Sequence, residues 1–125
     1  GLLVFDYGYL NNKNLNKLQS IQKHKYTNFL NRPGKVDITS HVNFGLYNEV
    51  LKKNDLNVEK IIPQSEFLQK MGIIQRANLL SNKMTFKEKA NMFYRLKRLL
   101  NYAEMGNLFK VFFSKKKNIN FSLGF

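Results

Sequence analysis

The sequence Leu-Leu-Val-Phe-Asp-Tyr-Gly at residues 2–8 decides the fold. Residues 2–5 are apolar without alternation, which is typical of a strand buried on both faces in a parallel sheet. Such a strand needs a neighbouring strand at each edge, and the rest of the chain contains only two further good strands. The sequence therefore looks truncated before residue 1. We expect residues 2–5 to pair with at most one strand and to leave a large apolar surface exposed.

Composition limits the class of protein. The chain has 125 residues, of which 43% are apolar, and this fits one small domain and excludes a disordered chain. It has no cysteine, which excludes disulfides, thiolate metal sites and a cysteine nucleophile and is compatible with a reducing compartment. With only two histidines, no metal site is expected. No apolar run approaches the roughly 18 residues that a membrane span requires.

The net charge of +13 has two interpretations. A nucleic acid or an anionic membrane surface would attract such a chain. The other interpretation is compositional, because the basic residues are 17 Lys and only 4 Arg, beside 17 Asn. Recognition of bases and phosphates depends on arginine forks, which are scarce here. The sequence favours the compositional interpretation and keeps a basic nucleic-acid-binding module as an alternative.

Hydrophobic periodicity predicts a mixture of helices and strands. A helix is predicted over 44–53, with Asn43 as its N-cap. An alternating apolar pattern predicts a strand over 56–62, and an apolar run predicts another over 108–113. Residues 9–36 are compatible with one or two helical turns or with extended structure, and the sequence does not decide between them.

Three helices are predicted between the last two strands. Ser65 is predicted to cap the first, which Gly72 ends, and the second follows directly. Thr85 and Glu88 form a capping box, from which the third helix runs to about residue 101. The basic face of this helix and the run Lys115–Lys117 are expected to be solvated.

Four stretches follow one another in a definite order. They are the apolar run ending in Asp-Tyr-Gly at 3–8; Pro33-Gly34 followed by Asp-Ile-Thr-Ser-His-Val-Asn-Phe at 37–44; Gln-Ser-Glu-Phe-Leu at 64–68 with Met-Gly-Ile at 71–73 and Arg-Ala at 76–77; and Met-Gly-Asn-Leu-Phe-Lys-Val at 105–111. Together they resemble the MidA family of S-adenosylmethionine-dependent methyltransferases, which in mitochondria serves the assembly of respiratory complex I. The second stretch is the most specific, although Asn43 replaces the family's usual aspartate there.

The resemblance implies an α/β, class I (Rossmann-like) methyltransferase fold, a seven-stranded sheet whose last strand is antiparallel. Residues 1–125 would be the C-terminal portion of a single methyltransferase domain. Strands five, six and seven would lie at 2–6, 56–62 and 108–113, with a helical insertion over about 65–101 between six and seven. No Gly-x-Gly-x-Gly occurs in the chain. The cofactor S-adenosylmethionine would then be bound mainly by a missing N-terminal half, and we expect this chain alone to bind it weakly and to be inactive.

The resemblance also implies the reaction and the partners. The acceptor would be an arginine of a protein, with a respiratory complex I subunit as a candidate. The location would be the bacterial cytoplasm, or the mitochondrial matrix in a eukaryote. Two rival functions stay open: the nucleic-acid-binding module and a noncatalytic assembly factor with the same fold.

Asp6 and Tyr7 are the first candidate site residues. Ligands of doubly wound sheets bind beyond the carboxyl ends of the strands, where these two residues stand. A guanidinium acceptor is matched by carboxylates, so Asp6 is the candidate that orients the acceptor, and Tyr7 could stack on a flat substrate group. The alternatives are that Asp6 caps the following loop and that Tyr7 packs in the ordinary way.

Asp37, Thr39 and His41 are the second group of candidates. They alternate, so in an extended segment all three point the same way. Asp37 and Thr39 could bind substrate, and His41 could act in proton transfer. The alternative is a hydrogen-bonded cluster that fixes the loop before the helix at 44–53, and for His41 alone the sequence favours this structural role.

Overall fold

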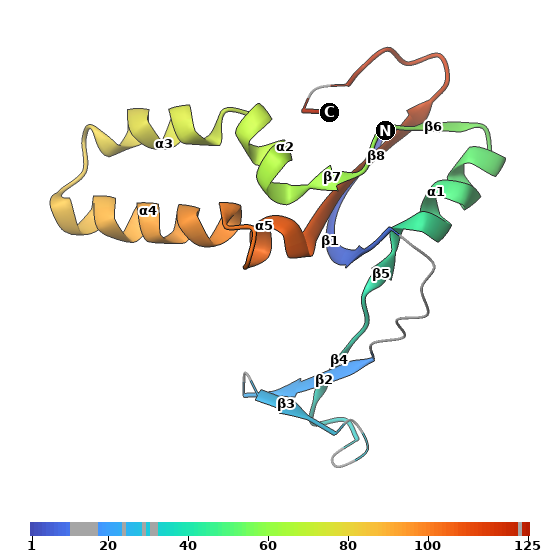
Figure 1. Cartoon of the computed structure of the whole chain (residues 1–125), viewed down its shortest axis with the longest axis horizontal. Helices are drawn as coiled ribbons and strands as arrows, with labels where there is room; N and C mark the ends of the chain where they lie inside the picture. The colour runs from blue at the N-terminus through green and yellow to red at the C-terminus, as the bar shows by residue number, and fades with distance from the viewer. Residues whose placement is uncertain (11–17, 24, 29, 31–32, 123) are drawn as a thin grey trace.

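A computed structural model describes residues 1–10, 18–23, 25–28, 30, 33–122 and 124–125. These residues form a mixed sheet with helices on both faces, a second small sheet, and a pair of helices that extends away from both sheets (Figure 1). The strands are β1 (Leu2–Tyr9), β2 (Gln19–Gln22), β3 (Lys25–Thr27), β4 (Asp37–Thr39), β5 (Val42–Asn43), β6 (Leu56–Val58), β7 (Ile62–Pro63) and β8 (Phe109–Lys116). The helices are α1 (Phe44–Lys53), α2 (Gln64–Lys70), α3 (Ile73–Ser81), α4 (Phe86–Leu100) and α5 (Met105–Leu108).

The larger sheet has the strand order β5-β1-β8-β6, and β7 also pairs with β8. The last strand, β8, is antiparallel to β1, β6 and β7, whereas β1 and β5 are parallel. An α/β fold with an antiparallel last strand is the fold class that the resemblance implied, and it is confirmed.

Strand β1 has one fully paired edge. Residues Leu2–Tyr7 pair with β8, and only Gly8 and Tyr9 pair with β5. Leu2, Leu3 and Phe5 are between 41% and 49% exposed. The expectation that residues 2–5 pair with a single strand and leave apolar surface open is therefore confirmed.

The strand predicted over 56–62 is interrupted. Strands β6 and β7 lie one after the other along the same edge of β8, and between them the Glu59 N–H donates to the Phe113 carbonyl at 3.0 Å. The predicted strand at 108–113 begins one residue later and continues to Lys116. The expectation of a solvated lysine run was wrong for Lys115, which is only 7% exposed.

Lys115 is buried because two acceptors hold its ammonium group. It forms an ion pair with Glu59 at 2.5 Å and donates to the Phe121 carbonyl. Glu59 is itself half-buried, with 27% of its side chain exposed. The pair therefore connects β8, the break between β6 and β7, and the C-terminal segment.

Lys115→Ala is expected to lower the free energy of unfolding by about 2 kcal/mol, because it leaves the Glu59 carboxylate partly buried and unpaired. Urea unfolding followed by circular dichroism measures the change. The neighbouring Lys116, which is exposed, is the matched control, and Lys116→Ala should cost less than about 0.5 kcal/mol. Equal losses in the two variants would contradict a structural role for the buried pair.

The two faces of the larger sheet are covered by different elements. Successive residues of β8 point to opposite faces. Phe112 packs against Phe44 of α1, with ring centroids 6.3 Å apart. On the other face Val111 forms a core cluster with Ile62 and Phe67, against which Phe125 packs. The C-terminal residue Phe125 thus helps to cover the second face.

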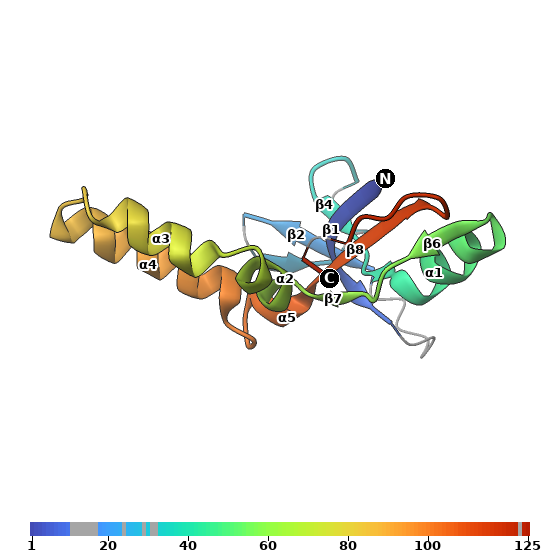
Figure 2. The ribbon, with the colours of Figure 1, turned by 90° about the horizontal axis from the view of Figure 1, so that it is seen from above.

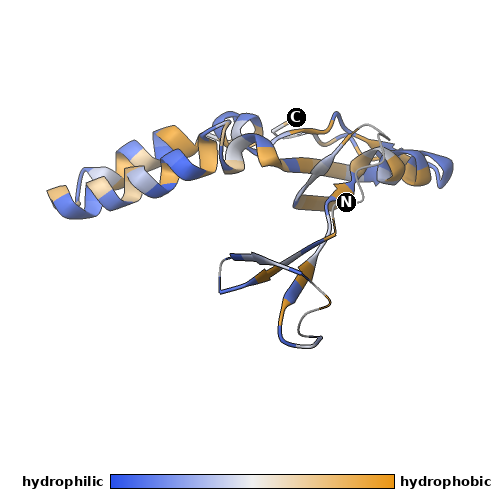
Figure 3. Ribbon diagram, turned by 60° about the horizontal axis from the view of Figure 1, so that its bottom comes forward, coloured by the Kyte–Doolittle hydropathy of each residue, from blue (hydrophilic) through white to orange (hydrophobic). Residues whose placement is uncertain are grey.

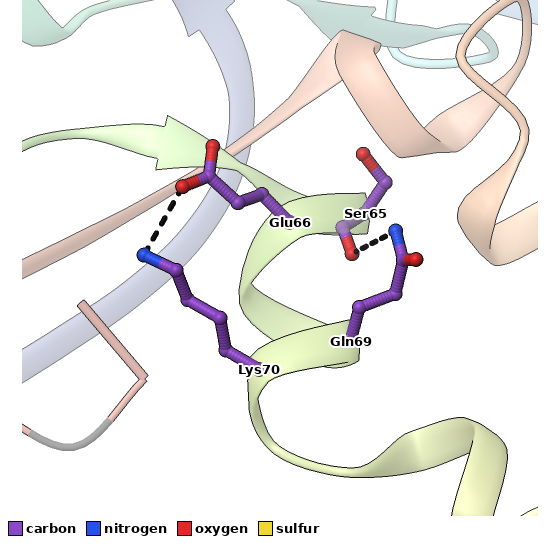
Figure 4. A network of polar contacts seen from close by, with 4 residues as sticks. All are labelled: Ser65, Glu66, Gln69 and Lys70. Atoms are coloured by element: carbon purple, nitrogen blue, oxygen red, sulfur yellow. Dashed lines mark hydrogen bonds and ion pairs between the residues drawn. The ribbon is translucent and has the colours of Figure 1, made fainter.

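The helices between β7 and β8 agree with the sequence in most respects. Helix α2 begins at Gln64, so the prediction that Ser65 caps it was wrong. The Ser65 carbonyl instead accepts a hydrogen bond from the Gln69 side chain at 3.0 Å, and Glu66 pairs with Lys70 at 3.1 Å (Figure 4). Gly72 ends the helix with a left-handed φ of 78°, as predicted.

The capping box before α4 is present as predicted. Thr85 Oγ1 accepts from the Glu88 N–H, and the Glu88 carboxylate accepts from the Thr85 N–H at 2.9 Å. Thr85 Oγ1 also donates to the Glu88 carboxylate at 2.7 Å, and this side-chain hydrogen bond, followed by the one from the Thr85 N–H, lowers the pKa of Glu88. Helix α5, which contains Gly106, was not predicted.

The described part of residues 9–36 is extended. Strands β2 and β3 pair with each other, and β2 also pairs with β4, in a sheet that projects away from the rest of the molecule (Figure 1). Residues 11–17, 24, 29 and 31–32 lie outside the described residues. Within the described ranges, we find no helix with the length and apolar character that a membrane crossing requires.

Candidate functional site

A small cavity lies beside Asp6 of β1. The prediction that the strand ends at residue 6 was wrong: β1 continues to Tyr9 through its pairing with β8 and β5, so Asp6 lies inside the strand. Alternation along the strand places Asp6 on the same face as Leu2 and Val4, the face that α1 covers. The cavity has a volume of about 180 Å³, and it is lined by Leu2, Val4, Asp6, Val42, Phe44, Tyr47 and Phe112. Asp6 is thus the one carboxylate in an otherwise apolar and aromatic lining.

The carboxylate of Asp6 is only partly occupied. Its Oδ1 accepts a hydrogen bond from the Tyr7 N–H at 2.8 Å. Among the described residues, no group donates to Oδ2. Asp6 therefore forms a local backbone contact, as the structural alternative expects, and still offers an acceptor to a ligand.

Lys110 stands opposite Asp6 in the β1–β8 ladder but does not form an ion pair with it. The Lys110 ammonium donates instead to the carbonyl and to the side-chain oxygen of Asn107, the latter at 2.9 Å. Partial burial lowers the pKa of Lys110. With Lys110 held by Asn107, the negative charge of Asp6 is left for another cation.

The size of the cavity limits what it can hold. A volume of 180 Å³ corresponds to roughly six water molecules. Sites for whole small-molecule ligands usually measure about 300 Å³ or more. The cavity is therefore suited to the end of a side chain, such as a guanidinium group. It does not fit S-adenosylmethionine, and no contact with that cofactor is assigned to any residue of this chain.

Tyr7 and His41 lie on the opposite face of β1 from Asp6. The Tyr7 ring meets the rings of His41 and Phe109 edge-on, with centroid distances of 5.4 and 5.7 Å. His41 Nδ1 is buried, and no described residue forms a hydrogen bond with it. Because neighbouring residues of a strand point to opposite faces, the structure separates Asp6 from the Tyr7–His41 pair.

Asp37 and Thr39 lie in the small sheet. They stand opposite Ile21 and Gln19 of β2, and Asp37 is exposed. The strand ends at Thr39, and the chain joins the larger sheet only from Val42 onward. The structure therefore distributes the predicted site residues over three places: Asp6 in the cavity, Tyr7 with His41 on the other face, and Asp37 with Thr39 in the small sheet.

Sequence reasoning did not include the aromatic walls of the cavity. Phe44 and Tyr47 of α1 were not named as candidates, and both line the cavity beside Asp6. Their spacing of three residues in a helix that follows the candidate strand was the available signal. It could not reveal that this helix face lies on the same side of the sheet as Asp6.

Comparison with protein families gives one match in the first half of the chain. Residues 1–62 match a family described as "Putative S-adenosyl-L-methionine-dependent methyltransferase". The matched region contains Asp6, Tyr7, His41, Phe44 and Tyr47, whereas Phe112, the third aromatic residue of the cavity lining, lies outside it.

Comparisons over nearly the whole chain also give methyltransferases as similar proteins. The chain is 28% identical over 121 residues to a mitochondrial protein arginine methyltransferase homologue of Caenorhabditis elegans, which covers 97% of this chain and 28% of that protein. It is also similar to two crystal structures of Burkholderia thailandensis proteins, each 26% identical over 98% of the chain. Their TM-scores are 0.80 and 0.78, and the second protein is bound to S-adenosyl-homocysteine. The chain spans 34% and 33% of these two proteins, so it corresponds to about a third of their length.

Proposed function

We propose that this chain forms the acceptor-binding part of an enzyme that methylates a protein arginine. The chain belongs to the MidA-like family of S-adenosylmethionine-dependent methyltransferases. The observation that carries this proposal is the Asp6 carboxylate in the aromatic cavity beside β1. The cofactor is proposed to bind mainly to parts of the enzyme outside these 125 residues, since the chain contains no glycine-rich turn.

The chemistry of the cavity supports an arginine acceptor. A guanidinium group has only donors, and Asp6 Oδ2 is an acceptor with no donor among the described residues. The Phe44 and Tyr47 rings can contact the faces of a planar cation, an interaction that a guanidinium makes more readily than an ammonium group does. Asp6 would thus orient the acceptor nitrogen.

The acceptor protein is proposed from the relatives together with the family resemblance. The Caenorhabditis elegans relative is a mitochondrial protein arginine methyltransferase homologue. We extend this to a protein substrate, with a respiratory complex I subunit as the candidate, and to the mitochondrial matrix in a eukaryote or the cytoplasm in a bacterium. Tyr7, Asp37, Thr39 and His41 remain candidates for contacts farther from the reacting nitrogen.

Methyl transfer to matched peptides tests the proposal. A methyltransferase that contains this chain, given labelled S-adenosylmethionine, should methylate an arginine peptide at least ten times faster than the same peptide with lysine in place of arginine, a difference of about 1.4 kcal/mol. Equal rates would contradict the arginine assignment. Cofactor binding without transfer to any peptide or protein would favour the noncatalytic assembly factor.

A further inference from the structure

Helices α3 and α4 form an arm that extends away from the larger sheet (Figures 1 and 2). The two helices lie side by side and are joined by residues 82–85. No residue of α4 is buried, and its first residue, Phe86, is 89% exposed. A helical pair that leaves large apolar side chains such as Leu80, Phe86 and Phe93 exposed is typical of an interaction site.

A groove runs along one side of the seam between these helices. It has a volume of about 250 Å³ and an almost entirely apolar lining. The lining residues are Ile73, Ala77 and Leu80 from α3 and Met92, Leu96 and Leu99 from α4, with Arg76 and Arg95 beside them. A second hollow shares Met92 and Arg95 with the groove and continues it toward the tip of the arm. Hydrophobic residues recur along both helices in Figure 3.

The charge of the arm selects the kind of partner. Residues 73–101 carry seven basic side chains and a single acidic one, Glu88. A second copy of this chain would bring the same positive charge to the groove, and like charges placed opposite each other oppose association. A partner with acidic residues beside an apolar stripe would complement both the groove and its arginines.

We propose that this groove binds an acidic amphipathic helix of a partner protein. The apolar stripe of that helix fills the groove between α3 and α4, and carboxylates on its flanks pair with Arg76 and Arg95. The groove lies on different elements from the Asp6 cavity, so the proposal does not depend on the proposed methyl transfer.

A designed peptide provides the probe. It is a capped helix of about five turns, near 18 residues, with leucines at positions i, i+4 and i+7 and glutamates on both flanks. Fluorescence anisotropy with the full chain should give a Kd in the range of about 10–100 μM, which is ordinary for a single helix in a groove. The same peptide with lysine in place of each glutamate should bind at least ten times more weakly.

Two matched pairs of variants locate the binding surface. Leu80→Glu places a charge in the groove and should weaken the acidic peptide at least tenfold. Leu79→Glu changes a 72% exposed neighbour outside the lining and should not. Arg95→Glu should weaken the acidic peptide and strengthen the lysine peptide, whereas Arg98→Glu, the same charge change on the same helix outside the lining, should have a smaller effect on both. Circular dichroism confirms that all four variants fold.

Other outcomes would overturn the proposal. No binding of the acidic peptide below 1 mM, or equal losses within either variant pair, would show that the groove is not its site. If analytical ultracentrifugation shows a dimer for the wild-type chain and a monomer for Leu80→Glu, the groove binds a second copy of the chain. The chain could also bind phosphatidylserine vesicles. If Leu80→Glu abolishes that binding and Leu79→Glu does not, the groove binds an anionic lipid surface.

Discussion

Asp6→Asn is expected to lower methyl transfer by at least tenfold in a methyltransferase that contains this chain, a loss of about 1.4 kcal/mol of transition-state stabilisation. The substitution keeps the shape of the side chain but removes its charge. It also turns one acceptor into an amide donor, which opposes a guanidinium that has only donors. Rates with saturating S-adenosylmethionine and an arginine peptide measure the effect.

The expected loss of activity can be separated from any effect of Asp6 on stability. Asp6 Oδ1 accepts from the Tyr7 N–H, and an asparagine oxygen can still accept this hydrogen bond. Asp6→Asn should therefore leave the melting temperature and the affinity for S-adenosylmethionine close to those of the wild type. Full activity per folded molecule in Asp6→Asn would remove Asp6 from the acceptor site. A lower melting temperature, with activity falling only in proportion to folded protein, would support loop capping alone.

Gly8→Ala is expected to lower the free energy of unfolding by about 3 kcal/mol, because the new methyl group has no space. A Cβ at Gly8 would lie 2.1 Å from the Val42 carbonyl oxygen and 2.9 Å from the Phe44 ring. Neither the backbone of β5 nor the first residue of α1 can move away without opening the β1–β5 pairing at Gly8 and Val42. Urea unfolding of the chain measures the loss.

Gly34→Ala is the control for this prediction. Gly34 has a positive φ of 76°, and no atom lies within 4 Å of the position that an alanine Cβ would take, so alanine there meets backbone strain without a clash. Its cost should be about 1 kcal/mol. If Gly8→Ala lowers the free energy of unfolding by no more than Gly34→Ala does, the close approach of β1 and β5 does not require glycine at residue 8.

Local signals predicted the individual helices well. Helix α1 covers the predicted residues 44–53, and the Asn43 side chain accepts from the Leu46 N–H at 3.1 Å as its N-cap. The capping box at Thr85 is present for the same reason: each cap is formed within one turn of the chain. Ser65 shows the limit of such signals, since the backbone had already turned into a helix one residue earlier.

Pairing between distant segments was harder to predict. The burial of Lys115 depends on Glu59 and on the carbonyl of Phe121, and neither contact leaves a trace in the sequence around the lysine run. The small sheet likewise depends on pairing between β2 and β4, across residues whose local pattern was ambiguous. A short segment without strong periodicity adopts the conformation that its partner strand imposes.

By itself, the sequence predicted the α/β class, a strand that begins at residue 2, and the caps of α1 and α4; it also named Asp6 as the leading site residue, which stays a prediction. These rest on apolar runs, turn chemistry and short motifs, which act over a few neighbouring residues. Only the tertiary structure decided that Asp6 shares a cavity with Phe44 and Tyr47, while Tyr7 and His41 lie on the other face. It also decided that Phe86 and Phe93 of α4 stay exposed. The side of a sheet that a helix covers is set by strand pairing and packing across the whole fold, and no local pattern encodes it.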